Sequence, residues 1–359
     1  MRTTIKHKIN IMRAIKTIMI LVLIVTPRFA FTQDKLSNAE KDSIILKIKE
    51  LIIENYVFVN EIANVNHSID SLFKTGKYNR ITNYKEFAQT LTDDLRGITK
   101  DLHFRVNYNP DFIKTILSEP EGEEEDTNWE KEQGLKENFG FSKIEILDGN
   151  IGYFKFNFFY PLEIVKPTID ATMGFIANTD AIIIDLTDNQ GGYGPTDNYI
   201  GSFFLGEKPI QWAVSFDRPS NKKTSDSTFT NIGGQRMIDK PLYILISKNT
   251  VSNAEKFAYC LQKLDRAKIV GIKSAGAANG SDFLVINRNF GIQIPVVKIT
   301  IPTTNSNWEG IGVQPDIEST KEQALKVAYL ESLNMLIKKT DDAEQIKKYE
   351  EIKTKINNR

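Results

Sequence analysis

Leu242-Tyr243-Ile244-Leu245-Ile246, followed after a short turn by Thr250-Val251-Ser252-Asn253-Ala254-Glu255, is the stretch that decides the fold. An apolar run of this length is typical of a strand that is buried on both faces of a sheet. The apolar periodicity that follows predicts a helix beginning near Asn253. The sequence therefore predicts a sharp strand-to-helix turn, with the hydroxyl of Ser252 at its helical end.

The Ser252 hydroxyl has two interpretations at this position. A hydroxyl at the start of a helix lies beside unpaired backbone N–H groups and the positive end of the helix dipole, which can stabilise a developing oxyanion. Serine is also a favoured N-cap residue, whose side chain satisfies one of the same N–H groups. The turn alone does not separate a catalytic serine from a capping serine, so the choice depends on residues elsewhere in the chain.

A glycine-rich loop follows a second predicted buried strand. Ala181-Ile182-Ile183-Ile184 is a short β-branched run, and it leads into Asp185-Leu186-Thr187-Asp188-Asn189-Gln190-Gly191-Gly192. Paired glycines let the backbone turn tightly and let main-chain N–H groups approach a ligand closely. This loop and the N–H of Asn253 could therefore supply a pair of oxyanion donors, although an ordinary turn would have the same sequence.

The chain contains three histidines, His7, His67 and His103. His7 lies in a predicted export signal, and His67 lies in an Asn-His-Ser segment that is typical of a solvated helix end or loop. His103 follows an amphipathic helical pattern and stands at the start of a predicted strand. It is the best candidate for a general base, and a half-buried structural histidine is the alternative.

Four segments together resemble the carboxyl-terminal processing, or tail-specific, serine peptidases, and in particular the branch with tricorn core protease and the repeats of interphotoreceptor retinoid-binding protein. The resemblance implies a crotonase-like, ClpP-like spiral of strands and helices, within the mixed α/β (α+β) class that the periodicity itself predicts. It covers roughly residues 100–320. The segments are Asp101-Leu102-His103, Asp185 to Gly192, Thr250 to Glu255, and Trp308-Glu309-Gly310-Ile311-Gly312-Val313-Gln314-Pro315-Asp316-Ile317.

The resemblance also implies roles for individual residues. Ser252 would be the nucleophile, His103 its general base, and Glu309 the carboxylate that orients the base and stabilises the imidazolium. The reaction would be acyl transfer to the serine and then hydrolysis of the acyl-enzyme, without a cofactor or a metal ion. The oxyanion donors would be the main-chain amides of Asn253 and of the Gly191-Gly192 turn.

Two positions depart from the family pattern. One branch of the family places a lysine base after the serine, and Ala277 occupies that place here, so Lys273 would have to be displaced into the site to replace it. The histidine-dependent arrangement is therefore preferred. Tricorn-like members have a serine just before the histidine, whereas this chain has Leu102. Glu309 must then reach His103 directly or through another hydroxyl.

Composition excludes several classes of function. The 359 residues are 41% hydrophobic and 26% charged, which suffices for one sizeable core and a smaller module. Basic and acidic residues number 46 each, and the chain shows no basic stripe with interleaved aromatics, so a nucleic-acid partner is not expected. Cofactor and metal motifs such as His-Glu-x-x-His are missing. The single cysteine, Cys260, can form no internal disulfide.

The N-terminus predicts an export signal over residues 1–32. Basic residues up to Lys16 precede an apolar run from Ile18 to Val25, and Phe29 to Gln33 offers an imperfect cleavage region. The apolar run is too short to span a bilayer comfortably. We expect a periplasmic or extracellular protein, with retention by an uncleaved N-terminal anchor as the alternative, and no membrane span in the mature chain.

The pattern of apolar residues divides the rest of the chain into three predicted regions. Apolar residues at helical spacing predict a helical N-terminal module over residues 33–100, followed by a catalytic core over 101–320 and a helical tail over 321–359. Glu119 to Asp126 is a run of like charge, typical of a surface loop near residues 119–130. Only 47 residues separate His103 from the strand predicted at Ile151, which is too few for the PDZ domain of many family members.

The expected activity is cleavage of peptides or unfolded proteins by an exported serine-type endopeptidase. A catalytically idle member that binds an apolar or peptide ligand is the main alternative, because Leu102 and Asn253 are unusual for an active site of this family. A crotonase-type acyl-CoA enzyme is a further alternative, since that scaffold also uses paired backbone amides for an oxyanion. The export signal and the lack of a visible basic pocket argue against it.

Overall fold

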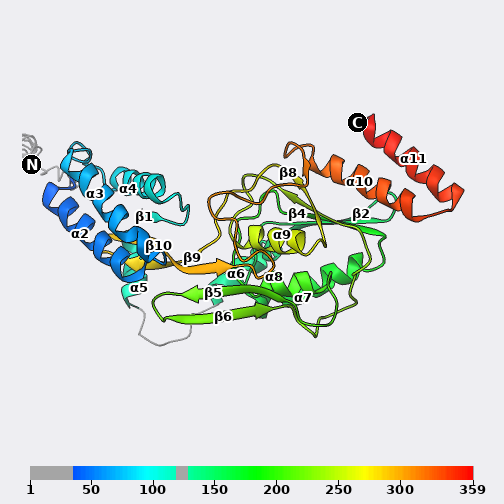
Figure 1. The fold of residues 1–359 in the computed structure, drawn as a ribbon, viewed down its shortest axis with the longest axis horizontal. Helices are drawn as coiled ribbons and strands as arrows, with labels where there is room; N and C mark the ends of the chain where they lie inside the picture. Colours follow the sequence, from blue (N-terminus) through cyan, green and yellow to red (C-terminus); the bar gives the residue numbers. More distant parts are fainter. Residues whose placement is uncertain (1–34, 119–127, 359) are drawn as a thin grey trace, which may run out of the picture.

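The computed structural model describes residues 35–118 and 128–358. The export signal predicted over residues 1–32, including His7, lies outside the described residues, and so does the acidic run Glu119 to Asp126. Within the described part of the chain, no helix has the length and apolar character needed to cross a bilayer. Figure 1 shows a helical N-terminal part, a central part with two sheets, and two helices at the C-terminal end.

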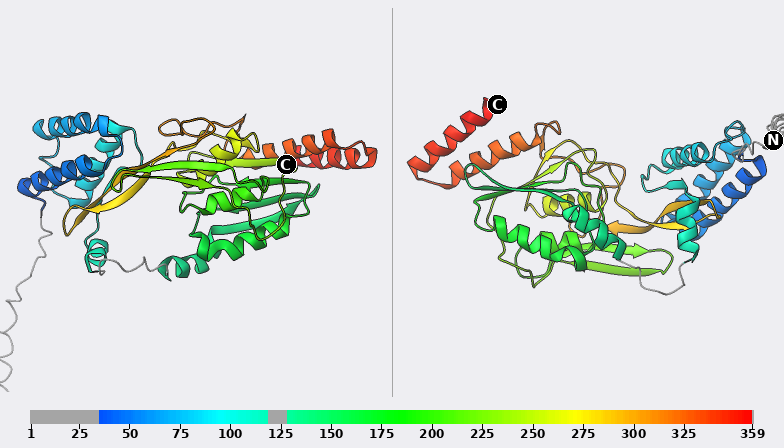
Figure 2. Two further views of the ribbon diagram at one scale, coloured as in Figure 1. Left: turned by 60° about the horizontal axis from the view of Figure 1, so that its bottom comes forward. Right: turned by 180° about the vertical axis from the view of Figure 1, so that it is seen from behind.

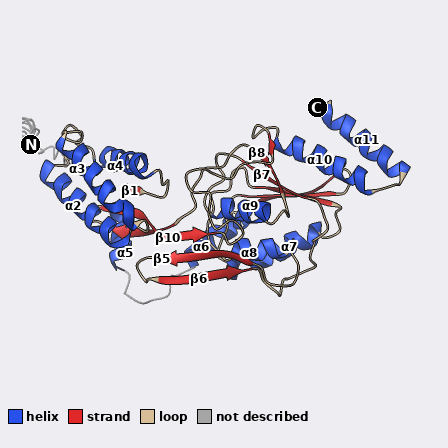
Figure 3. Cartoon of the chain, in the orientation of Figure 1, coloured by secondary structure: helices blue, strands red, loops and turns tan. Residues whose placement is uncertain are grey.

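A six-stranded sheet forms the centre of the larger part (Figure 3). Its strand order is β11-β8-β7-β4-β3-β2, with parallel pairing everywhere except between β2 and β3. The parallel strands are short apolar runs because helices cover both faces of the sheet. The strands are β2 (Phe141–Leu147), β3 (Ile151–Phe156), β4 (Ala181–Asp185), β7 (Leu242–Ile246), β8 (Lys268–Gly271) and β11 (Ile317–Glu318).

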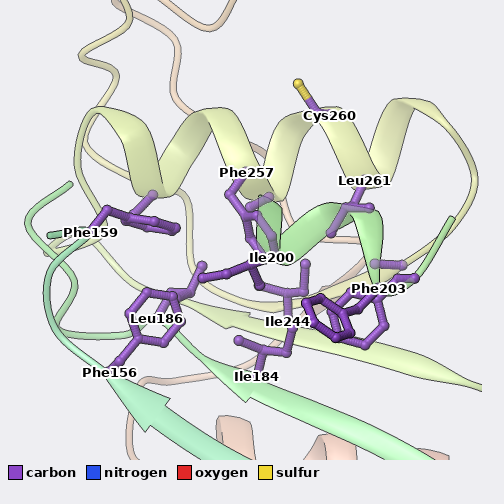
Figure 4. Packing of buried hydrophobic residues seen from close by; sticks show 14 of the residues in the cluster. Phe156, Phe159, Ile184, Leu186, Ile200, Phe203, Ile244, Phe257, Cys260 and Leu261 are labelled. Carbon is purple, nitrogen blue, oxygen red and sulfur yellow. The ribbon is translucent and has the colours of Figure 1, made fainter. Parts of the chain in front are cut away.

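Alternate side chains of each strand enter different cores. Ile184 and Ile244 pack in the core formed with helices α7 (Leu162–Ile176), α8 (Thr196–Ser202) and α9 (Asn253–Lys263). Figure 4 shows Phe257 and Leu261 of α9 directed toward these strands. The neighbouring residues of the same strands pack on the opposite face against α10 (Ala324–Lys339) and α11 (Ala343–Asn357). The predicted C-terminal tail is therefore helical, and it covers a face of the sheet.

The helical N-terminal part packs on a second sheet. Its helices are α2 (Asn38–Asn55), α3 (Ile62–Lys74) and α4 (Tyr84–Thr99), and they share a hydrophobic core with β1 (Arg105–Tyr108) and β10 (Phe290–Thr300). The sheet has the order β1-β10-β5-β6, with β9 also paired to β10. Strand β10 pairs with β1 at one end and with β5 at the other, so it runs from the helical part into the centre of the molecule (Figures 1 and 2).

Side-chain bonds reinforce this connection. Arg218 donates from its guanidinium to the carbonyls of Ile53 and Tyr56 at the end of α2, and its backbone N–H donates to the carbonyl of Val296 on β10.

The other elements are η1 (Val59–Glu61), α5 (Pro110–Ser118), α6 (Asn128–Lys136), η2 (Asn138–Gly140), β5 (Gln211–Asp217), β6 (Lys222–Ser227) and β9 (Gly280–Val285).

This architecture confirms the predicted mixed α/β class with a helical N-terminal module. The helix predicted to begin near Asn253 begins at that residue, and the strand predicted over Leu242 to Ile246 has those bounds.

Truncation of Phe257 should destabilise the protein strongly. The ring is fully buried and contacts the rings of Phe159 and Trp212, with centroids 5.9 and 6.5 Å away. We expect Phe257→Ala to lower the free energy of unfolding by about 3–5 kcal/mol, because it leaves a cavity in the central core. The matched control is Phe175→Ala on α7, whose ring is 54% exposed. Urea denaturation measures both, and equal losses in the two variants would contradict this view of the core.

Candidate active site

Ser252 occupies a strained position at the turn between β7 and α9. Its backbone angles are φ 55° and ψ −119°, which an L-residue rarely adopts. Such strain costs about 1–3 kcal/mol and persists only where the surroundings impose it. The Thr250 hydroxyl donates to the Leu186 carbonyl at 2.7 Å, and the Val251 N–H donates to the Asn189 carbonyl at 3.0 Å. The serine turn is therefore bound to the glycine-rich loop after β4.

The buried carboxylate of Glu255 fixes the other side of this turn. It accepts the Ser252 N–H at 2.8 Å, the Ser274 hydroxyl at 2.6 Å, and the N–H groups of Gly276 and Ala277 at 2.7 and 2.9 Å. Burial raises the pKa of this carboxyl, and the hydrogen bonds oppose that shift. Glu255 therefore holds the Ser252 backbone from the first turn of α9, in the manner of the N3 residue of a capping box.

The glycine turn lies directly against Ser252. A Cβ added at Gly191 would lie 2.9 Å from the Ser252 Cβ and 3.0 Å from the Asn253 nitrogen, so only glycine fits there. The N–H of Gly191 donates to Asn189 Oδ1 at 2.9 Å. The N–H groups of Gly192 and Asn253 make no hydrogen bond to any other described residue. These two groups remain open for a ligand.

A pocket of about 200 Å³ opens beside the nucleophile candidate. It is lined by residues of the serine turn and helix α9 (Ser252, Asn253, Lys256), of the glycine turn (Gly192), and of the opposite wall (Asn279, Trp308). The open N–H groups of Gly192 and Asn253 thus belong to residues that share one pocket with the Ser252 side chain. A larger hollow of about 330 Å³ adjoins the far side of the glycine turn, where Gln190 and Tyr193 line it.

His103 lies on the loop between α4 and β1 and is held by Asp101. Its Nδ1 is 3.1 Å from Asp101 Oδ1, and its backbone N–H donates to the same oxygen at 2.9 Å. Asp101 is buried, with 2% of its side chain exposed, and 14% of the His103 side chain is exposed. This contact favours the tautomer with the proton on Nδ1, which leaves the lone pair on Nε2. His103 Nε2 is buried and has no hydrogen-bond partner among the described residues.

Glu309 approaches the same group from the loop that follows β10. One ligand atom each from Asp101, His103 and Glu309 lies within 4.8 Å of the others. Glu309 Oε2 accepts the N–H groups of Ala278 and Asn279 at 2.7 and 3.1 Å, and Oε1 has no hydrogen-bond partner in the described part of the chain. Burial and then the neighbouring Asp101 carboxylate raise the pKa of Glu309 to about 7.

Asn279 connects this acidic group to the serine pocket. Its side-chain amide donates to Glu309 Oε2 at 3.0 Å and to Asp101 Oδ2 at 3.5 Å, and the same residue lines the pocket of Ser252. No hydrogen bond between His103 and Ser252 is present in the described residues. The structure therefore brings His103 and Glu309 together, and it brings Ser252 together with the glycine turn.

Three residues of this site were not singled out as site residues by the sequence analysis. Asp101 stands two positions before His103, a spacing at which a carboxylate can bond both the backbone and the ring, so that signal was present in the sequence. Lys256 follows Ser252 by four residues at the start of the predicted helix, so its nearness was visible in the sequence. Asn279 carries no such signal, because its place in the site depends on how distant loops fold together. Ala277, at the family's lysine position, is buried, and its carbonyl accepts the Trp308 indole N–H at 3.1 Å.

Among residues 35–118 and 128–358, one group of side chains has the residue types and the spacing needed to hold a metal ion. Asp101, His103 and Glu309 form that group of three side chains. Each already has a contact with the protein: the imidazole with Asp101, and both carboxylates with Asn279. The chemistry that this arrangement supports directly is the orientation and charge stabilisation of an imidazole.

Comparisons with known proteins point to one peptidase family. The family model described as peptidase family S41 matches residues 150–319, and the model described as the N-terminal domain of that family in eukaryotic interphotoreceptor retinoid-binding protein matches residues 37–138. A carboxyl-terminal-processing protease of Synechocystis sp. is 29% identical over 137 residues, which cover 38% of this chain and 30% of the relative. The nisin-resistance protein of Lactococcus lactis is 26% identical over 171 residues, covering 43% and 51%.

The fold has a solved counterpart. A crystal structure from Parabacteroides merdae, described as a candidate peptidase, superposes with a TM-score of 0.54 at 16% identity and covers 79% of this chain and 92% of that one. At this identity the likeness concerns the fold alone. The chain spans about a third to a half of the length of the two curated relatives above. The family models and the relatives together support a serine peptidase, a hydrolase.

Glu309 should make the stability of the protein depend on pH. Its pKa is about 7 in the folded state against an ordinary value of 4.5, so the folded state holds this proton more tightly. The associated stability is fully present below pH 4.5 and is lost as the pH rises through 7. We expect Glu309→Gln to remove a fall of up to roughly 3 kcal/mol in the free energy of unfolding across this window, since one pKa unit corresponds to about 1.4 kcal/mol.

Urea denaturation at several pH values measures this slope. The exposed Glu132→Gln variant is the matched control and should keep the wild-type profile. A Glu309→Gln profile that still falls as steeply as the wild type between pH 4.5 and 7 would contradict the assignment of the shifted proton to this carboxyl.

Proposed function

Because the chain belongs to peptidase family S41, we propose that it is a serine peptidase in which Ser252 is the nucleophile. The observation that supports this most is the Ser252 turn itself. The residue is held at φ 55°, its N–H is bound by Glu255, and its side chain shares a pocket with two residues whose N–H groups are open. The bound N–H alone also suits a capping serine, whereas a strained backbone beside a pocket with two open N–H groups suits a nucleophile next to an oxyanion site.

The proposed oxyanion donors are the N–H groups of Gly192 and Asn253. The N–H of Gly191 already donates to Asn189, so we propose that Gly191 contributes close approach to the serine, while Gly192 supplies the donor. The Asn253 N–H lies at the first residue of α9, where the helix dipole adds to its attraction for negative charge. Removal of one such donor typically costs about 10²–10³ in turnover.

His103 is the proposed general base. Asp101 holds its Nδ1, so Nε2 is the nitrogen that would take the proton from the Ser252 hydroxyl. Glu309 is close enough to stabilise the imidazolium that forms, and it has an unused oxygen with which to do so. The hydrogen bond between base and nucleophile would form when substrate binds, as catalytic hydrogen bonds are often long in the unliganded state.

The proposed reaction is hydrolysis of a peptide bond in two steps. Ser252 Oγ attacks the carbonyl carbon while its proton passes to His103 Nε2. The tetrahedral oxyanion is held by the two N–H groups, and the imidazolium then protonates the leaving amine. Water attacks the acyl-enzyme by the same route and regenerates the free serine.

We propose peptides or unfolded proteins as the substrates and the cell envelope or exterior as the location. The two curated relatives are a carboxyl-terminal-processing protease and a nisin-resistance protein, and both names are compatible with a peptide substrate. The basic and apolar segments between Arg2 and Val25 support export. An idle member that only binds a peptide or apolar ligand is the alternative, and an activity-based probe separates the two.

A fluorophosphonate probe should label Ser252. We expect stoichiometric labelling of the wild-type protein, none of Ser252→Ala, and at least a hundredfold slower labelling of His103→Ala, because the base is required to activate the hydroxyl. Intact-mass spectrometry measures the extent, and peptide mapping locates the adduct. His67→Ala is the matched control and should label at the wild-type rate. A wild-type protein that folds but does not react would favour the idle binding protein.

Replacement of Gly191 should abolish labelling without unfolding the protein. Its added methyl group would collide with the Val251 carbonyl at 2.8 Å and with the Ser252 Cβ, and its φ of 91° disfavours any other residue. We expect Gly191→Ala to slow fluorophosphonate labelling at least a hundredfold. Gly174→Ala is the matched control, because a Cβ at that position meets nothing within 4 Å. Thermal melting of both variants shows whether a lost reaction reflects the site or the fold.

A further inference from the structure

The pocket beside Ser252 contains one charged side chain, that of Lys256. Lys256 follows Ser252 by four residues, in the first turns of α9, and both residues line this pocket. Only 9% of the lysine side chain is exposed. Gly194 also lines the pocket, and a Cβ there would lie 3.4 Å from Lys256 Nζ. The absence of a side chain at Gly194 therefore keeps the space next to the ammonium open.

The ammonium is paired with a carboxylate that does not itself line the pocket. Lys256 Nζ lies 3.2 Å from Asp197 Oδ2, which also accepts the Trp212 indole N–H at 2.7 Å. Asp197 is fully buried and does not line the pocket, and its Oδ1 has no hydrogen-bond partner within the described residues. The carboxyl of Asp226 on β6 also acts on the ammonium without lining the pocket. The one charged side chain that lines the pocket is therefore an ammonium, and its carboxylate partners do not line it.

A buried ion pair of this kind is weak evidence for a stabilising role. An apolar pair of similar volume would often be as stable, because two charges lose their hydration on burial. A lysine that was needed only to balance Asp197 would have no reason to adjoin the serine pocket. The ammonium has three donors, and Asp197 accepts one of them in the structure. A ligand in the pocket can therefore accept another.

Lys256 is not suited to be the base that activates Ser252. Burial lowers the pKa of the lysine, but the carboxylates of Asp197 and Asp226 outweigh burial and raise it above its ordinary value. The side chain therefore stays protonated, and a protonated amine cannot take the serine proton.

We infer that the pocket beside Ser252 selects a carboxylate of the substrate, which Lys256 binds through its ammonium group. This inference rests on the proposed peptidase function and adds the substrate class to it. Two sources of the carboxylate fit the same chemistry: an aspartate or glutamate side chain near the cleaved bond, or the free C-terminus of the chain being cut. With 200 Å³ of space the pocket holds one such group and a short aliphatic stem.

The test uses a variant that removes both charges together. Lys256→Met combined with Asp197→Asn removes both members of the buried ion pair. The partly buried Asp226 remains, and burial raises its pKa and so favours its neutral form, so the fold should survive. The matched control is Lys49→Met combined with Asp70→Asn, an ion pair of 2.6 Å in the helical N-terminal part. Thermal melting and fluorophosphonate labelling establish that each variant is folded and retains an active serine.

A synthetic peptide library, prepared with free and with amidated C-termini, then reports selectivity by mass spectrometry. We expect the wild type to favour an acidic residue over its amide by at least tenfold at one position next to the cleaved bond, or to favour free over amidated termini by the same factor. The first result assigns a side-chain carboxylate and the second a terminal one. In the double variant the preference should fall to about one, and the control should keep it.

A measurement without turnover covers the case in which no library peptide is cut. N-acetylglutamate amide and acetate represent the two carboxylate sources, and each should slow fluorophosphonate labelling of the wild type more than N-acetylglutamine amide or acetamide does. This protection should be absent in the double variant. Labelling without such a difference, or a difference that the double variant retains, would overturn the carboxylate inference while the peptidase proposal stands. No labelling at all would overturn both.

Discussion

The parallel pairing of β4 with β7 is the constraint on which the site depends. Ile182 lies opposite Leu242 and Asp185 opposite Leu245, so both strands end at the same edge of the sheet. The loops that follow must then meet, and the hydrogen bond from the Val251 N–H to the Asn189 carbonyl joins them. Loops at the carboxyl ends of parallel strands are where α/β proteins build their sites. The glycine turn and Ser252 are neighbours because of this register.

Glu255 fixes the backbone conformation of the Ser252 turn, which lies beside the glycine turn. A carboxylate buried this completely is unfavourable unless its oxygens accept hydrogen bonds, and four donors from the serine turn and the loop after β8 supply them. The same bonds oppose relaxation of the strained Ser252 turn. In the sequence this residue reads as an ordinary N3 glutamate of a capping box, a local helix signal. Its contacts with Ser274 and Gly276 are long-range, and no local pattern predicts them.

The sequence predicts the parts of the structure that local interactions determine, and it does not predict those that depend on contacts between distant segments. The strand at Leu242, the helix at Asn253 and the mixed α/β class were predicted because apolar periodicity is local. The role proposed for Asp101 was missed although its spacing from His103 was visible, since Glu309 already filled that role in the family resemblance. The position of His103 depends on β10, which pairs with β1 and β5 and so joins residues far apart in the chain. Pairings of that kind are not encoded in any single segment.

The charged side chains near the Ser252 pocket bear on both the proposed catalysis and the proposed selection of an acidic substrate. Two carboxylates, Asp101 and Glu309, lie on the His103 side of Asn279, while the ammonium of Lys256 lies on the Ser252 side. An imidazolium formed during acylation would be stabilised by the first group, whose ligand atoms lie within 4.8 Å of one another. A substrate carboxylate would instead be bound at Lys256, which is not one of that group. Under both proposals an acidic substrate would be bound by Lys256, while His103, the proposed base, would keep its own carboxylate partner, Asp101.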